Sequence, residues 1–211
     1  ELGATHDGTN TSAYNLAMIL KSQERYEEAE PLFLRALNGR ISNLGEDDYH
    51  TANVMFALGE MYDLSGRSDE AIVLLKRAWN GRVKSLGETH PDSVAAALAL
   101  FSIYGRQNRV NEAREVAASL LETTESNFGN DAPETLKTSM ILADVLDYAG
   151  EYDQAAPLYI RILDAGEIRA GAEDYLRAAE MVASLAEQKL SDQQFSKAEE
   201  LYRHALTAIE G

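Results

Sequence analysis

The fold is decided by a linker and its copies, of which the clearest reads Leu86-Gly87-Glu88-Thr89-His90-Pro91-Asp92-Ser93. Its pair of an apolar residue and a glycine recurs every 42 positions, as Leu2-Gly3, Leu44-Gly45, Leu86-Gly87, Phe128-Gly129 and Ala170-Gly171. A hydroxyl residue follows the glycine by six positions at Thr9, Thr51, Ser93 and Thr135. A repeat of this length is typical of a solenoid of stacked supersecondary units, which binds other molecules more often than it catalyses reactions.

Between the linkers, apolar residues recur at spacings of 3, 4 and 7, which indicates helices that each bury one stripe. When the repeats are aligned, equivalent positions form columns. One column holds Leu16, Leu58, Leu100 and Leu142, and another holds Ala29, Ala71, Ala113 and Ala155. Gly66 and Gly150 lie where the first helix of a pair has to stop. We therefore predict an all-α fold, a right-handed superhelix of about five helix–turn–helix repeats. We expect a single array over 1–211, with repeats at about 9–44, 51–86, 93–128, 135–170 and 172–211.

Linker residues also predict how the helices begin and end. We expect the linker glycines to end the second helices with positive φ. We expect the hydroxyls of Thr9, Thr51, Ser93 and Thr135 to cap the first helices, with Pro91 and Pro133 just outside those caps. Asn38-Gly39-Arg40 recurs as Asn80-Gly81-Arg82 inside a second helix. Because glycine there costs up to about 1 kcal/mol relative to alanine, we interpret the small residue as a sign of crowding against the neighbouring repeat.

Composition narrows the class of partner. Hydrophobic residues make up 45% of the chain, and 35 acidic residues against 19 basic ones give a formal charge of −16. Nucleic acid and anionic membrane surfaces are therefore not expected as partners, because both attract basic proteins. The chain has no cysteine, which fits a cytoplasmic protein. It starts inside the linker pattern at Glu1, so we expect a piece of a longer protein.

Catalytic and metal-binding patterns are missing from the sequence. His6, His50, His90 and His204 do not form a metal-binding spacing. No glycine-rich phosphate loop and no nucleophile elbow occurs. We therefore predict that the chain is not an enzyme and that it needs neither a cofactor nor a metal.

Two stretches, Arg25-Tyr26-Glu27-Glu28-Ala29-Glu30-Pro31-Leu32-Phe33 and Gly150-Glu151-Tyr152-Asp153-Gln154-Ala155-Ala156-Pro157-Leu158-Tyr159, resemble the tetratricopeptide repeat. The 42-residue period and the linker resemble the kinesin-light-chain-like variant of that family. The resemblance implies a protein–protein interaction scaffold, in which first helices line a concave groove that grips an extended peptide or partner segment. The alternative is a regulatory or sensor segment of a larger multidomain protein with a kinase, protease or ATPase module. Such a segment would contact its own chain or self-associate through its terminal helices.

The resemblance also assigns first-helix positions to the groove, and these are Tyr14, Asn15, Met18, Asn53, Phe56, Glu60, Asp63, Arg106, Lys137, Asp144, Asp147 and Tyr148. Carboxylates would attract a cationic ligand, and aromatic faces would add cation–π contacts. The expected partner is therefore a protein or peptide with basic and apolar side chains. The other interpretation is that these acids are only the solvated faces of amphipathic helices. In kinesin light chains, asparagines of the groove clamp the peptide backbone. Of the equivalent positions in this sequence, only Asn15 is an asparagine.

Overall fold

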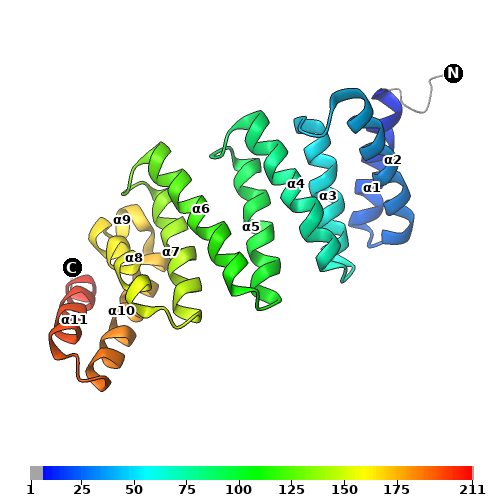
Figure 1. The fold of residues 1–211 in the computed structure, drawn as a ribbon. Helices are drawn as coiled ribbons and strands as arrows, with labels where there is room; N and C mark the ends of the chain where they lie inside the picture. The colour runs from blue at the N-terminus through cyan, green and yellow to red at the C-terminus, as the bar shows by residue number, and fades with distance from the viewer. Residues whose placement is uncertain (1–6, 211) are drawn as a thin grey trace. The chain divides into compact units, whose positions relative to one another are not determined.

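The computed structural model describes residues 7–210, and within this range the chain is helical and contains no strand (Figure 1). The helices are α1 (Asp7–Ser22), α2 (Tyr26–Leu44), α3 (Tyr49–Leu64), α4 (Ser68–Leu86), α5 (Pro91–Arg106), α6 (Val110–Phe128), α7 (Pro133–Tyr148), α8 (Tyr152–Ala165), α9 (Glu167–Ala170), α10 (Ala172–Ser191) and α11 (Phe195–Glu210). The predicted all-α fold of helix–turn–helix repeats is confirmed. In the range that is described, none of the helices combines the length and apolar character that a membrane crossing requires.

The chain divides into two compact units, of which unit 1 spans Glu1–Arg109. In unit 1, α1 packs on α2 and α3 on α4, and α2 and α4 each also pack on the first helix that follows. The first helices contact one another as well, α1 with α3 and α3 with α5. Ala29, Phe33, Leu58, Leu75 and Leu100 are completely buried in this core. Alanine in the packed columns brings the helices close together, and the larger residues fill the space between them.

Unit 2 spans Val110–Gly211 and repeats this packing. In it α6 packs on α7, α7 on α8, α8 on α10, and α10 on α11. Leu136, Tyr159, Ile162 and Val182 belong to its buried core. The fourth repeat departs from the expected continuous second helix, because α8 ends at Ala165 and the short α9 follows Gly166. Gly166 has a φ of 81°, a conformation that interrupts a right-handed helix.

Three helices begin one turn earlier than expected, so the predicted caps were wrong. Helix α5 starts at Pro91 and α7 at Pro133, with His90 and Ala132 as the N-cap residues. Proline suits the first helical position, where its fixed φ is helical and no N–H is needed. Ser93 Oγ instead donates to the carbonyl of Gly87 at 2.8 Å, and Thr135 Oγ1 donates to that of Gly129 at 2.7 Å. The hydroxyl residues thus tie the first turn back to the linker. Thr51 likewise lies inside α3, whose cap is Asp48, and Thr9 lies inside α1.

The expected positive φ is confirmed for the linker glycines Gly45, Gly87, Gly129 and Gly171, while Gly3 lies outside the described residues. Gly45 and Gly87 end α2 and α4 with φ of 92° and 91°. Within the hairpins, Gly66 and Gly150 have positive φ, and Glu24, Asn108 and Gln193 adopt the same conformation in the other turns. The Arg67 N–H donates to the carbonyl of Tyr62 at 2.8 Å, the six-to-one bond of a Schellman motif.

The small residue in the second helices is crowded by its own hairpin rather than by the neighbouring repeat, so that interpretation was wrong. A Cβ on Gly39 would lie 2.3 Å from the amide of Asn10 in α1. A Cβ on Gly81 would lie 3.1 Å from Cβ of Ala52 in α3. Both neighbours belong to the first helix of the same hairpin. The glycines therefore set how closely the two helices of a hairpin approach.

Candidate functional site

The first helices of unit 1 border a hollow of about 190 Å³. It is lined by Lys21 of α1, Glu60, Asp63 and Leu64 of α3, Leu75 of α4, and Ala99, Ser102 and Ile103 of α5. Leu75 and Ile103 are almost fully buried and form an apolar floor. Two of the predicted groove residues, Glu60 and Asp63, lie side by side on its polar rim. The hollow can therefore bind an apolar side chain of a ligand against its floor, with charged groups at its edge.

Both rim carboxylates are already paired with cations of the same unit. Lys21 Nζ lies 2.6 Å from Glu60 Oε2, and Arg106 Nη2 lies 2.5 Å from Asp63 Oδ2. Ser68 Oγ also donates to Asp63 Oδ1 at 2.9 Å. The Arg106 side chain is 55% exposed, so it can leave Asp63 for solvent without unfolding anything. Unit 1 thus presents a rim of mixed charge, and a ligand cation would have to replace Lys21 or Arg106.

Asn53 and Phe56 of the predicted groove are held by a buried arginine of α4. Arg82 Nη2 donates to Asn53 Oδ1 at 2.9 Å, and its guanidinium carbon lies 4.0 Å from the centre of the Phe56 ring. Arg82 Nη1 donates to the backbone carbonyl of Asp92 at 2.7 Å. Burial lowers the pKa of the Arg82 guanidinium, against the opposing effect of the Asp92 carboxylate. Arg82 therefore links α3 to the start of α5 and fixes two predicted contact residues in place.

Arg40 has the same role one repeat earlier. Its guanidinium carbon lies 5.1 Å from the centre of the Tyr14 ring, and its Nη1 donates to the carbonyl of His50 at 2.7 Å. Burial raises the pKa of Tyr14. Asn15 is exposed and Met18 half-buried on the same helix. The two arginines were missed as candidates in the sequence, although the repeated Asn-Gly-Arg motif was the signal that could have found them.

Four predicted groove residues lie in unit 2, on α7. Asp144 forms an ion pair with Arg177 of α10 at 2.8 Å and accepts a hydrogen bond from Tyr159 at 3.0 Å. Burial raises the pKa of Asp144 more than Arg177 lowers it, and burial also raises that of Asp147. Tyr148 is 72% exposed, and Lys137 is exposed as well. Within the described part of the chain, neither Asp147 nor Lys137 forms an ion pair.

The structure thus places the predicted residues on first helices but gathers only some of them. The hollow of unit 1 brings Glu60 and Asp63 together, and Arg106 joins them through its ion pair. Tyr14, Asn53 and Phe56 pack against buried arginines instead. Two of the three aromatic residues that were expected to meet a ligand cation, Tyr14 and Phe56, therefore already contact cations of the chain itself.

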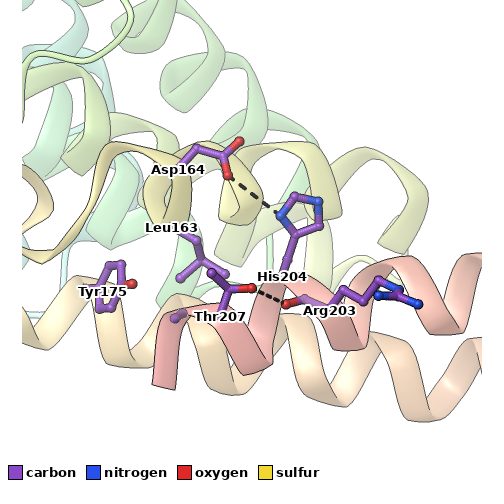
Figure 2. Close-up of a pocket in the computed structure, with 7 residues that line it drawn as sticks. Leu163, Asp164, Tyr175, Arg203, His204 and Thr207 are labelled. Atoms are coloured by element: carbon purple, nitrogen blue, oxygen red, sulfur yellow. Dashed lines mark hydrogen bonds and ion pairs between the residues drawn. The ribbon is translucent and has the colours of Figure 1, made fainter. Parts of the chain in front are cut away.

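A second hollow, of about 320 Å³, lies in unit 2 among α8, α10 and α11 (Figure 2). Figure 2 shows Asp164 of α8 pointing at His204 of α11, with Oδ1 and Nδ1 3.7 Å apart. The Thr207 hydroxyl on the same helix donates to the carbonyl of Arg203 at 2.8 Å (Figure 2). Among the described residues, no group of three or more histidines and carboxylates could hold a metal ion.

Comparisons with known proteins agree with the fold. Family models of the tetratricopeptide repeat match residues 8–82 and 140–173. The crystal structure of the nearly identical TPR-like repeats of a putative kinesin light chain from Podosopora anserina is 20% identical, with 96% of each chain covered and a TM-score of 0.64. BtubC (BKLC) from P. vanneervenii is also 20% identical, with 92% of this chain and 77% of that chain covered and a TM-score of 0.60. No curated protein matches the chain.

Stacked helical hairpins with a hollowed first-helix face define an α-solenoid of the kind that mediates protein–protein interactions. The chain belongs to the tetratricopeptide repeat family. Its fold is similar to that of kinesin-light-chain TPR-like repeats. Sequence identities of 20% support the fold, and the function has to be argued from the residues.

Proposed function

We propose that the chain is an interaction scaffold that binds an extended segment of a partner protein on the first-helix face of unit 1. The observation that carries the proposal is the hollow among α1, α3 and α5, whose apolar floor is surrounded by paired charges. Concave apolar sites with a few convergent polar groups are where proteins usually take up ligands. The size of the hollow suits one apolar side chain of the partner. The absence of cysteine supports a cytoplasmic setting, and scaffolding needs neither a reaction nor a cofactor.

The rim charges support a ligand with a basic residue next to the apolar one. A ligand cation can take the place of Arg106 at Asp63 while Arg106 turns to solvent. Exchanging one partly exposed ion pair for another changes the free energy by no more than about 1 kcal/mol. Burial of the apolar side chain then supplies most of the affinity, about 1.5–3 kcal/mol for one residue. The exposed amide of Asn15 can donate to and accept from the ligand backbone.

Unit 2 is proposed to make a separate contact with the same kind of ligand. The exposed ring of Tyr148 offers an aromatic face, and Asp147 offers a carboxylate that no cation of the described residues neutralises. Lys137 gives that face mixed charge, as Lys21 and Arg106 do in unit 1. A segment that alternates apolar and charged side chains would therefore suit both units.

Selection from a library of random peptides, followed by titration calorimetry, tests the proposal. Ala99→Leu fills the hollow and is expected to weaken the selected peptides about 10- to 100-fold, the loss of one buried apolar side chain. Val73→Leu, at a 58% exposed position of α4, is the matched control and should leave affinity unchanged. Circular dichroism of both variants confirms that they fold. If the two variants bound every selected peptide with equal affinity, the peptides would not bind in this hollow, and the proposal would be wrong.

A further inference from the structure

Helix α1 exposes an apolar face that the other first helices of unit 1 bury. The side chains of Leu16 and Ile19 are 48% and 54% exposed. The same columns one and two repeats further on hold Leu58, Leu100, Met61 and Ile103, which are at most 1% exposed. Those residues are buried because their helices pack on a preceding hairpin. Within the described residues no helix covers the corresponding face of α1.

Helix α11 exposes the complementary face. Tyr202 and Leu206 are 37% and 54% exposed. The column of Tyr202 holds Phe33, Leu75, Ala117 and Tyr159, all fully buried. The column of Leu206 holds Leu37, Trp79, Leu121 and Leu163, of which the three leucines are at most 7% exposed and Trp79 is half-buried. Next to Tyr202 and Leu206 lies a largely apolar hollow of about 470 Å³, which Leu190 and Phe195 also line. Inside the array, this face of a second helix is the one that meets the next first helix.

The charges at these two faces are also those of an internal junction. Between the first and second repeats, Arg67 Nη1 donates to Glu30 at 2.9 Å, while its Nε and Nη2 hold Glu70 three residues further on. Arg25 occupies the column of Arg67, and its Nε and Nη2 hold Glu28 in the same way. Glu199 occupies the column of Glu30, and its side chain is 65% exposed on α11, where it pairs with Arg203 of the same helix at 2.6 Å. Arg25 and Glu199 therefore occupy the positions that Arg67 and Glu30 occupy at an internal junction. One lies near each end of the described helices.

We propose that the chain associates head to tail with a second copy, α1 of one copy packing on α10 and α11 of the other as a first helix packs on the hairpin before it. Leu16 and Ile19 would then be buried against Tyr202 and Leu206, and Arg25 would pair with Glu199. Exposed apolar faces of this kind mark interaction surfaces. Because the two faces differ, the contact is heterologous, so each dimer keeps one free face of each kind and grows further or closes into a ring.

Sedimentation velocity of the 211-residue chain over a wide concentration range tests this inference. The weight-average mass is expected to rise with concentration, and Leu16→Glu and Leu206→Glu are each expected to weaken association at least tenfold. Val73→Glu is the control, because its column is exposed in every described repeat. A chain that stays monomeric throughout would overturn the proposal. Loss of association with Leu206→Glu alone would overturn it too, since that result indicates a symmetric tail-to-tail dimer.

A charge exchange gives a second readout that a merely misfolded variant cannot imitate. Arg25→Glu and Glu199→Lys are each expected to weaken self-association about fivefold, as like charges meet at the junction. Mixing the two variants in equal amounts should restore association to the level of the wild-type chain, because unlike copies then present opposite charges at both junctions. A mixture that associates no better than its components would show that these two residues do not face each other. Peptide binding at the first-helix hollow is independent of either outcome.

Discussion

Replacing Gly39 with alanine probes the close approach of α1 and α2. The new Cβ would lie 2.3 Å from Oδ1 and Nδ2 of Asn10 and 2.4 Å from its Cγ, against at least about 3.4 Å for an ordinary contact. Asn10 is fully buried, so its amide has to move by about 1 Å in a packed interior. Overpacking of this kind costs about 1–3 kcal/mol, and disturbed hydrogen bonding of the amide adds about 1 kcal/mol. Alanine returns about 1 kcal/mol in helix propensity, so we expect a net destabilisation of about 2 kcal/mol.

Urea unfolding followed by circular dichroism measures this difference, with two variants as controls. Gly105→Ala adds a Cβ in open space within α5 and should stabilise the chain by about 0.5–1 kcal/mol. In an Asn10→Ala background the obstacle is gone, so Gly39→Ala should become stabilising as well. If Gly39→Ala and Gly105→Ala shift the free energy of unfolding alike in the wild-type background, the packing argument is wrong.

Three further predictions concern turns, titration and the buried arginine. Gln193 has a φ of 61°, so Gln193→Gly should raise the free energy of unfolding by about 1 kcal/mol in urea, and a loss would argue against strain in that turn. The hydrogen bond from Arg67 lowers the pKa of Glu30 below its ordinary value of 4.5. The ionised carboxylate therefore stabilises the fold fully above pH 4.5, and this contribution is lost as the pH falls through the lowered pKa. Glu30→Gln should therefore be less stable than the wild type at pH 7 and equally stable at pH 2.5, in thermal melts at both values; a constant gap would contradict the linkage. Arg82→Ala leaves two half-buried acceptors, on Asn53 and Asp92, without this donor and should cost about 2–4 kcal/mol in urea unfolding. A loss below about 1 kcal/mol would show that the link to α5 is dispensable.

The fold could be predicted from the sequence because the same pattern of apolar positions recurs in each repeat. The errors concern where helices begin and which helix lies opposite a small residue, and this pattern contains neither. A hydroxyl six residues after a glycine looks like a cap, yet Pro91 lets α5 begin earlier and turns Ser93 back to the Gly87 carbonyl. The partner of Gly39 could not be known either, because column spacing does not say which helix lies opposite a small residue.

The candidate site was predictable only as a set of positions on first helices. Lys21 and Glu60 are 39 residues apart, and their ion pair depends on the rotation between successive hairpins, which the sequence does not give. An acidic strip was therefore expected where unit 1 has paired charges. The packing of Arg82 under Phe56 was equally hidden, since a basic residue in a second helix is ordinarily solvated.

Hydrogen exchange of the chain with and without a selected peptide tests the central claim most directly. Binding in the proposed hollow predicts slower exchange in α3 and α5, the helices that supply most of its lining, and no such protection in the Ala99→Leu variant. Protection confined to the second helices α2 and α4 would contradict the account.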